Sequence, residues 1–193
     1  MTKEEIKRLL DSSYGYLNVI IKDALLTGMR KGEILGLKWG NIDFDNNLII
    51  LDKTKNDDIR EIPMSNELRQ ILWDGSTGKK KDDYIFVDTN GKRFGDVKKG
   101  FHSALSRAGI DDFRFHDLRH CFASYLVMSG VDILTVQKLL GHRNISMTLR
   151  YSHLAPKHKQ DAINSLETNL KGYLGHVLGK FTGDDLPVDS IVE

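Results

Sequence analysis

Two histidines and an arginine open one predicted helix of this sequence, in the order His116, Arg119 and His120. Residues three or four apart project from the same side of a helix, so these side chains lie together near its start. The histidines are one turn apart and could form a metal pair. However, the segment lacks the glutamate that follows the first histidine in the H-E-x-x-H pattern. The alternative is that all three are ordinary surface side chains at a helix N-terminus.

A second group of candidates follows a predicted helix that begins after Asp132 and ends at Gly141. Aspartate is a favourable N-cap residue, and glycine suits the left-handed residue that ends a helix. His142 then leaves this helix at a fixed angle, either as a functional group or as a partner for the negative end of the helix dipole. Tyr151 lies nine residues further on in a polar stretch, although an isolated tyrosine often serves only in packing.

The remaining candidates are basic residues from the first third of the chain. Arg30 and Glu33 are spaced to share a helix face, so the carboxylate could hold the guanidinium by a charge-assisted hydrogen bond, or the two could form a plain surface ion pair. Lys55 lies in a polar stretch between two β-rich runs, eight residues before Pro63. A lysine in such a loop is usually solvated, so it carries little weight by itself.

Together these residues resemble the catalytic set of the tyrosine recombinases, the family of phage-type integrases and bacterial site-specific recombinases. The resemblance rests on T-G-x-R-x-x-E at 27–33, a hairpin lysine before a proline, H-x-L-R-H at 116–120, L-G-H at 140–142 and the tyrosine nine residues later. It covers roughly residues 2–170. Agreement of six residue types in order and spacing is very unlikely by chance.

The chemistry of the family explains why these residue types occur together. Cutting a phosphodiester without a metal requires cations at the non-bridging oxygens, and the forked guanidinium matches phosphate geometry. A phenol has a pKa of about 10, so a base must favour its ionisation, and the leaving 5′-oxygen needs a proton. The resemblance implies these roles: Tyr151 as nucleophile, Arg30 and Arg119 on the phosphate, Lys55 as general acid, His116 as general base, His142 as hydrogen-bond donor to the phosphate, and Glu33 and His120 in support.

The resemblance also implies a covalent 3′-phosphotyrosyl intermediate with no cofactor, metal or ATP, because the ester retains the bond energy for religation. Three alternatives stay open. A type IB topoisomerase would use a similar residue set and relax supercoils without synapsis. A metal-dependent hydrolase would use the histidines at positions 116, 120, 142 and 153. A DNA-binding module that kept the fold would have no activity.

The elements that position these residues are mostly helical. Hydrophobic periodicity and capping residues favour a mainly α domain with a small antiparallel β-sheet, the α+β architecture of the tyrosine recombinase catalytic domain. The predicted helices lie at about 2–10, 16–27, 30–37, 65–73, 97–108, 117–128, 133–140 and 157–170, with a short turn after 146, and the predicted strands at 48–51, 59–63 and 84–87.

Composition excludes several protein classes. Hydrophobic residues make up 40% of the 193 residues and charged residues 28%, values typical of a globular protein. Cys121 is the only cysteine, so no intrachain disulfide forms, and this suits a reducing compartment. No apolar run reaches membrane length and the first residues do not resemble a signal peptide. These features favour a protein of the cytoplasm, and the resemblance to phage-type integrases and bacterial recombinases implies a bacterial or phage-borne protein associated with the nucleoid.

Charge is distributed unevenly along the chain. The net charge is +1, but the last thirteen residues hold four acidic and no basic side chains, so residues 1–180 carry +5. We expect a catalytic domain at 1–171, a C-terminal tail at 172–193 and no N-terminal core-binding domain. The apolar segment from Tyr173 to Phe181 in the tail is a candidate for docking on a neighbouring protomer. The resemblance implies double-stranded DNA as partner and a tetramer on DNA, with a monomer when the domain is isolated.

Overall fold

The computed structural model describes residues 1–51, 59–155 and 159–178. The chain divides into two compact units, Met1–Ala155 and Pro156–Glu193. The first unit contains the helices α1 (Lys3–Asp11), α2 (Tyr16–Thr27), α3 (Lys31–Leu35), α4 (Asn66–Gly75), α5 (Lys98–Ala108), α6 (Asp117–Met128), α7 (Ile133–Leu140) and α8 (Ser146–Leu149), with short 3-10 turns η1 (Trp39–Asn41) and η2 (Ser152–Leu154). The second unit contains α9 (Lys159–Leu178).

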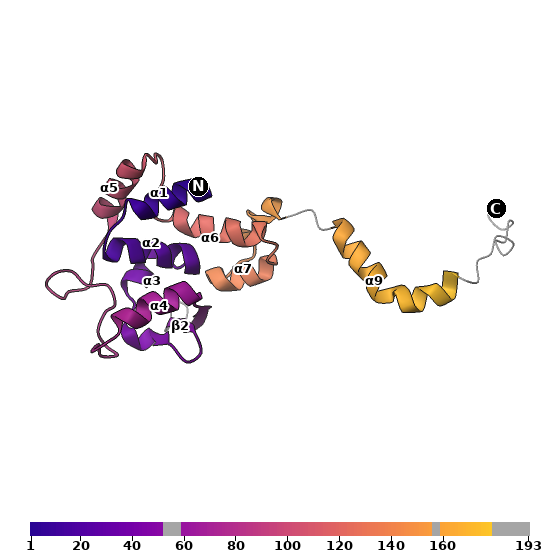
Figure 1. The fold of residues 1–193 in the computed structure, drawn as a ribbon, viewed down its shortest axis with the longest axis horizontal. Helices are drawn as coiled ribbons and strands as arrows, with labels where there is room; N and C mark the ends of the chain where they lie inside the picture. Colours follow the sequence, from indigo (N-terminus) through magenta and orange to yellow (C-terminus); the bar gives the residue numbers. More distant parts are fainter. Residues whose placement is uncertain (52–58, 156–158, 179–193) are drawn as a thin grey trace. The chain divides into compact units, whose positions relative to one another are not determined.

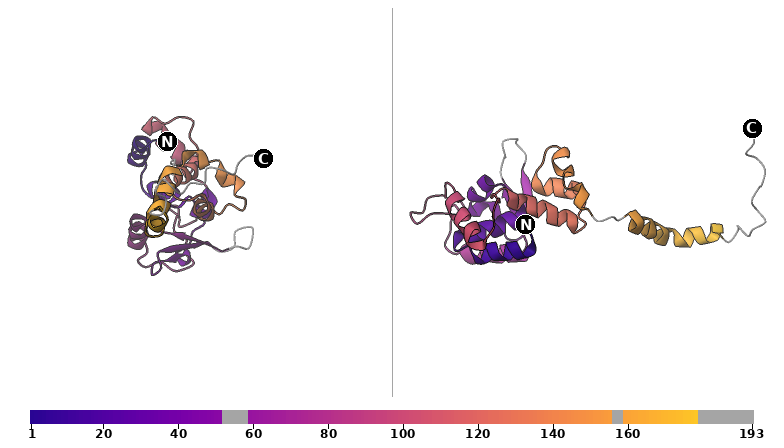
Figure 2. Two further views of the ribbon diagram at one scale, coloured as in Figure 1. Left: turned by 90° about the vertical axis from the view of Figure 1, so that its right-hand side faces the viewer. Right: turned by 90° about the horizontal axis from the view of Figure 1, so that it is seen from above.

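A three-stranded antiparallel sheet of β1 (Ile42–Asp43), β2 (Leu48–Leu51) and β3 (Arg60–Pro63) lies beside these helices, in the order β1-β2-β3. Ile49 pairs with Ile62, and both are buried, so one face of the sheet packs on the core. In the first unit the sheet lies with α3 and α4 on the side away from α1 and α5 (Figure 1; Figure 2).

Two apolar clusters hold the first unit together. The larger cluster combines buried side chains from α1 to α5, the sheet and the start of α6, among them Ile20, Ile34 and Phe86. The smaller cluster joins α6 to α7 and contains Tyr151. Figure 1 shows α2 and α6 side by side through the middle of the unit, so α6 takes part in both clusters.

Capping residues set the helix ends that matter for the site. Thr2 and Glu5 form the predicted capping box of α1. The Asp132 side chain accepts a hydrogen bond from the backbone of Thr135 at the start of α7. Gly28 and Gly141 end α2 and α7 in the left-handed conformation, as the sequence indicates. Both glycines therefore lie where a helix ends and a candidate catalytic residue follows.

The observed fold confirms the predicted class and differs in detail. The two-residue strand β1 escapes sequence-based prediction because it is too short to show alternation. The predicted strand at 84–87 is wrong: Tyr84 and Val87 form only isolated bridges, to Lys38 and Arg93. The last helix runs to Leu178, beyond the predicted end at 170. Among the described residues no helix is long and apolar enough to cross a membrane.

Candidate active site

Arg119 is the most enclosed of the candidate residues. Its side chain projects from α6 and is 3% exposed. Nη1 donates to the carbonyl oxygen of Gly28 at 2.5 Å and Nη2 to that of Leu140 at 2.6 Å. These carbonyls belong to the C-terminal ends of α2 and α7, where helix dipoles place negative partial charge. Burial, then the charges of Arg30 and Arg60, lowers the pKa of Arg119 to about 10, so it remains a cation at neutral pH.

The alternative that Arg119 is a surface side chain is therefore wrong. The sequence indicates a single apolar stripe on α6, with Arg119 and Ala123 pointing away from it. Both are buried, because α6 packs against α2 on one side and against α7 and η2 on another. Because α6 packs on two sides, Arg119 and Ala123 do not face solvent. The apolar stripe in the sequence indicates only one of these two packed sides.

Glu33 joins Arg30 to a third arginine. Arg30 is exposed and donates through Nη1 to Glu33 Oε1 at 2.8 Å, and its backbone N–H donates to Oε2 at 2.8 Å. Arg60 Nη2 donates to the same Oε2 at 2.6 Å. Burial favours a higher pKa for Glu33, but hydrogen bonds from Arg30 and the charge and hydrogen bond of Arg60 outweigh it and lower the pKa. The carboxylate therefore stays ionised between two guanidinium groups.

Arg60 is a site residue that sequence reasoning missed. It lies on β3 opposite Leu51, is 9% exposed, and donates through Nη1 to the carbonyl oxygen of Leu140 at 2.9 Å. The signal was present in the strand alternation, because Arg60 and Ile62 point inward while Glu61 and Pro63 point outward. An arginine whose side chain points from a strand toward the core needs a carboxylate or carbonyl oxygen as a hydrogen-bond partner, and here Glu33 provides the carboxylate.

His116, His120 and Tyr151 form a chain of aromatic contacts. His116 is exposed at the N-terminus of α6, and its ring meets that of His120 edge-on at 5.1 Å between centroids. His120 Nδ1 and Tyr151 Oη are 2.5 Å apart. Burial, then the charges of His120 and Arg119, lowers the pKa of His116. The alternative that the histidines are surface side chains thus holds for His116 but not for His120, which is partly buried.

Tyr151 follows α8 and packs in the smaller apolar cluster at 6% exposure. Burial raises the pKa of its phenol, although the nearby charges of Arg150 and Arg119 act in the opposite direction. The tyrosine is therefore both a packing residue and a hydrogen-bonded polar group, two readings that the sequence left as alternatives.

His142 leaves α7 just after the left-handed Gly141, as predicted. Its Nδ1 is 2.9 Å from the hydroxyl of the buried Thr148, and its carbonyl oxygen accepts from Gln137 Nε2 at 3.0 Å. Burial, then the charges of Arg119 and Arg30, lowers the pKa of His142 to about 4. The ring is therefore neutral at neutral pH, and its other nitrogen is free of the Thr148 contact.

These contacts bring together Arg30, Glu33, Arg119, His142 and the histidine-tyrosine group, with α6 at the centre. Lys55 lies outside the described residues. Within the described ranges no three histidine, cysteine, aspartate or glutamate side chains gather closely enough to hold a metal ion.

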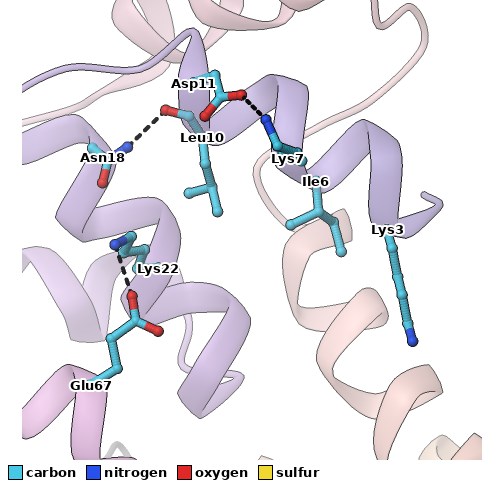
Figure 3. A pocket seen from close by; sticks show the side chains of 8 residues that line it. All are labelled: Lys3, Ile6, Lys7, Leu10, Asp11, Asn18, Lys22 and Glu67. Atoms are coloured by element: carbon cyan, nitrogen blue, oxygen red, sulfur yellow. Dashed lines mark hydrogen bonds and ion pairs between the residues drawn. The ribbon is translucent and has the colours of Figure 1, made fainter.

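A separate cavity of about 390 Å³ lies between α1, α2 and the start of α4 (Figure 3). None of the candidate residues lines it. Two of its lysines are ion-paired, Lys7 with Asp11 at 2.7 Å and Lys22 with Glu67 at 2.8 Å. Its apolar wall is formed by Ile6 and Leu10. The cavity is thus a surface feature distinct from the arginine and tyrosine cluster.

Arg119, held by carbonyl oxygens at two helix ends, and His120, hydrogen-bonded to Tyr151, are thus neighbours on the same helix, α6. Residues 1–158 match the model of the phage integrase family, and the chain belongs to this family. The resemblance inferred from the sequence is thereby confirmed.

Individual relatives agree with this assignment. The integrase of Salmonella phage P22 is 31% identical over 85% of this chain and 46% of its own length. The XerC-like tyrosine recombinase of Caldanaerobacter subterraneus is also 31% identical, over 84% of this chain and 52% of its own length. This chain spans about half the length of the curated relatives it matches.

Two solved structures share the fold. The catalytic domain of bacteriophage HP1 integrase is 32% identical, with a TM-score of 0.69, and the match covers 85% of this chain and 92% of that one. XerA recombinase is 27% identical with a TM-score of 0.70, covering 88% of this chain and 64% of that one. The matched catalytic domain of HP1 integrase is thus almost fully represented in this chain.

Proposed function

We propose that this chain is the catalytic domain of a site-specific recombinase that cuts and rejoins double-stranded DNA through a 3′-phosphotyrosyl intermediate. The observation that carries the proposal is the clustering of Arg30 and Arg119 with neutral His142, next to a tyrosine whose phenol is already hydrogen-bonded. The family and the names of the relatives, integrases and tyrosine recombinases, support it.

In this proposal the arginines neutralise the scissile phosphate. Arg30 is exposed and oriented by Glu33, so it can reach a bound duplex, whereas Arg119 is fixed by two backbone carbonyls. Preorganised guanidinium groups stabilise the charge of the pentacoordinate transition state without reorganising. His142, which is neutral, would donate from its free ring nitrogen to a non-bridging oxygen.

Tyr151 would attack the phosphorus, and the 5′-oxygen would leave as a hydroxyl. We assign the proton for the leaving oxygen to Lys55, on the basis of its position in the family pattern. His116 and His120 are the two histidines near the phenol, and the sequence favours His116 as the base. The ester bond would conserve the energy of the broken phosphodiester, so that rejoining needs no ATP or metal.

The test is a covalent-adduct assay. Wild-type protein is incubated in EDTA with a pool of nicked duplexes that carry candidate attachment sequences, and the products are separated on a denaturing gel. The nick releases the 5′-fragment, so adduct accumulates. Tyr151→Phe keeps the ring in its apolar cluster and removes only the hydroxyl, so it should fold normally and give no adduct. An adduct that persists in this variant would refute the assignment.

The alternative of a type IB topoisomerase is tested with the same protein. A recombinase exchanges strands between two marked duplexes, whereas a topoisomerase relaxes a supercoiled plasmid without exchange. The relatives described above are named an integrase and a tyrosine recombinase, which favours the first outcome. An inactive DNA-binding module would bind duplex equally well with phenylalanine at position 151 and form no adduct in either case.

We also propose that α9 mediates self-association on DNA into a tetramer. Ile163, Leu166, Leu170 and Tyr173 recur along one side of the helix and are all exposed within the described residues. Burying such a stripe on a neighbouring protomer would remove apolar surface from water. Leu166→Glu together with Leu170→Glu should then reduce assembly on DNA in analytical ultracentrifugation. The variant should leave cleavage by single protomers intact.

The DNA substrate also sets where the protein would act. We propose that it works on chromosomal or phage DNA in the cytoplasm of a bacterial cell, at the nucleoid. Fluorescence microscopy of a tagged full-length protein would test this, with co-localisation with the nucleoid expected.

A further inference from the structure

The shortest side-chain contact of the candidate nucleophile is with His120. Nδ1 of His120 lies 2.5 Å from Oη of Tyr151, and the two ring centroids are 6.0 Å apart. His120 projects from α6 one residue after the buried Arg119, so the backbone that positions the phosphate-binding guanidinium also positions this imidazole. The family pattern assigns His120 only a supporting role.

His116 is placed differently. It is exposed at the first turn of α6, and its ring contacts His120 rather than the phenol. His120 therefore lies between His116 and Tyr151. A proton that leaves the phenol along the existing hydrogen bond arrives at His120 first, and efficient proton transfer requires hydrogen-bond distance between the two heavy atoms.

The surroundings of the phenol strengthen the requirement for a direct acceptor. The tyrosine ring packs among Phe122, Ala123, Val136 and Leu140, which restrict the approach of water. Desolvation disfavours a phenolate at this position, while the positive charges of Arg119 and Arg150 favour it. The phenol can thus ionise only if a neighbouring group takes its proton while cations stabilise the oxygen.

We propose that His120 is the catalytic base that takes the proton from Tyr151 during strand cleavage. This inference rests on the proposed function of the chain. The neutral imidazole, protonated at Nε2, accepts the phenolic proton at Nδ1. Oη forms a bond to phosphorus as the bond from phosphorus to the 5′-oxygen breaks, and that oxygen takes a proton from the general acid.

Religation runs the same step in reverse. The 5′-hydroxyl attacks the phosphotyrosine and gives its proton back to the general acid. The bond from phosphorus to Oη then breaks, and Oη regains the proton held by His120. No proton or electron is left over, and His120 ends each cycle neutral, as it began.

The first experiment needs no DNA. Nitrogen-15 NMR of the free protein near pH 8 reports which imidazole nitrogen of His120 carries the proton, with His120→Asn used for assignment. We expect an unprotonated Nδ1 whose resonance shifts in Tyr151→Phe, because the hydrogen bond is lost. A proton on Nδ1 would overturn the proposal, since His120 would then donate to the phenol oxygen.

The second experiment measures cleavage of the nicked duplexes by His120→Asn and the matched variant His116→Asn. Asparagine keeps a hydrogen-bonding atom close to the position of Nδ1 but cannot take a proton. Loss of a general base typically lowers the rate ~10²–10⁴-fold, so we expect His120→Asn to fall in this range and below His116→Asn. A rate for His120→Asn within a few-fold of wild type, or a larger loss in His116→Asn, would overturn the proposal.

A third measurement tests whether His120 acts as the base for Tyr151 or as the acid for the leaving oxygen. In a duplex whose bridging 5′-oxygen is replaced by sulfur, the leaving group needs no proton. We expect His120→Asn to stay slow on this substrate, whereas recovery would place His120 at the leaving group and refute the proposal. If wild-type protein forms no adduct at all, the proposed function fails, and the NMR result still decides whether His120 can accept the phenolic proton.

Discussion

Arg60 and Arg119 donate hydrogen bonds to the same acceptor, the carbonyl oxygen of Leu140, at 2.9 and 2.6 Å. Two guanidinium groups this close would repel each other without compensation. The C-terminal end of α7 supplies negative partial charge, and Glu33 supplies a full charge on the other side of Arg60. Side chains from the sheet and α6 thus meet at one carbonyl of α7, and Glu33 of α3 joins them through Arg60. The stability of the fold and the geometry of the site therefore depend on the same contacts.

The Arg60→Met variant tests this dependence. Methionine fills a similar volume but leaves the partly buried Glu33 without one of its two guanidinium partners. Breaking a buried ion pair from one side typically costs about 3–5 kcal/mol, so we expect a loss near the lower limit because Arg30 remains. Urea denaturation measures the free energy of unfolding, and the adduct assay should show slower cleavage because Arg30 is less firmly held.

Lys22→Met is the matched control. Lys22 pairs with Glu67 on the surface, with side-chain exposures of 27% and 60%, and exposed pairs contribute less than about 1 kcal/mol. Its unfolding free energy and its cleavage rate should stay near those of wild type. If Arg60→Met and Lys22→Met lost the same free energy of unfolding, Arg60 would contribute no more to stability than an exposed lysine does.

Gly28 is under two constraints at once. Its φ of +63° belongs to the left-handed region, and a Cβ at this position would collide with the ring of Phe122. Its carbonyl oxygen holds Arg119, so any shift of the backbone moves the catalytic guanidinium. We expect Gly28→Ala to lose stability by more than about 2 kcal/mol and to lose most cleavage activity, measured by denaturation and adduct formation.

Gly109→Ala measures the cost of backbone strain without the collision that a Cβ at position 28 would make with Phe122. Gly109 ends α5 with a φ of +62°, and no atom lies within 4 Å of the position where its Cβ would be built. The strain alone should cost about 1 kcal/mol, with cleavage unaffected. Similar stability for the two alanine variants would argue that Phe122 moves aside and that the close packing of α2 on α6 has no role.

Many of the helix ends and candidate site residues could be predicted from patterns of neighbouring residues in the sequence. The helix-ending glycines, the N-cap at Asp132 and the candidate residues follow from local sequence, because caps and motifs depend on neighbours in the chain. Arg60 could not be assigned in the same way, since its partners Glu33 and Leu140 lie far away in sequence. The burial of Arg119 was missed for the same reason, as it depends on packing of α6 against two other helices.

The hydrogen bond between His120 and Tyr151 is a further case. The sequence places the two residues in separate motifs. His120 lies on a helix and Tyr151 follows a short helical turn, so helical periodicity cannot predict that their side chains meet. The contact arises because α7 and α8 fold back on α6 and bring the tyrosine into the smaller apolar cluster. The role of Lys55 stays a prediction, because it lies outside the described residues.

Thr148 orients the ring of His142. The threonine hydroxyl is 2.9 Å from Nδ1, and Thr148 is fully buried. Thr148→Val preserves the shape and removes the hydroxyl, so we expect a stability loss of about 1 kcal/mol and cleavage slowed about tenfold. Thr77→Val, at an exposed position after α4, should change neither quantity.

A double-mutant cycle decides whether Thr148 acts through His142. In a His142→Gln background, Thr148→Val should have little further effect on the cleavage rate, because the ring that it orients is gone. Independent, multiplicative losses would indicate that the threonine influences catalysis by another route.

Asp23 is predicted to make the protein less stable as the pH rises. It is fully buried on α2, and its Oδ2 has no hydrogen-bond partner among the described residues. Burial raises the pKa of Asp23 from 3.8 to about 7, against the opposing effect of a hydrogen bond with Thr27. Between these values the folded state holds a proton that the unfolded state has lost, so the free energy of unfolding falls as the pH rises.

The size of this effect makes it measurable. Each pKa unit corresponds to about 1.4 kcal/mol, so the free energy of unfolding should fall by on the order of 4 kcal/mol between pH 4 and 7. Above pH 7 Asp23 should cause no further fall. Urea denaturation across this range should show the decline in wild type and a flatter curve in Asp23→Asn. At pH 8 the variant should be the more stable protein, because asparagine carries no charge to bury.

Asp132→Asn is the control of opposite sign. A hydrogen bond from Thr135 lowers the pKa of the exposed Asp132, so its contribution to stability is present above its ordinary pKa and lost in acid. Asparagine is also a good N-cap, so this variant should leave the decline between pH 4 and 7 unchanged. If wild type and Asp23→Asn instead show the same pH dependence, Asp23 is ionised in the folded protein and must be stabilised by a counter-charge or by water.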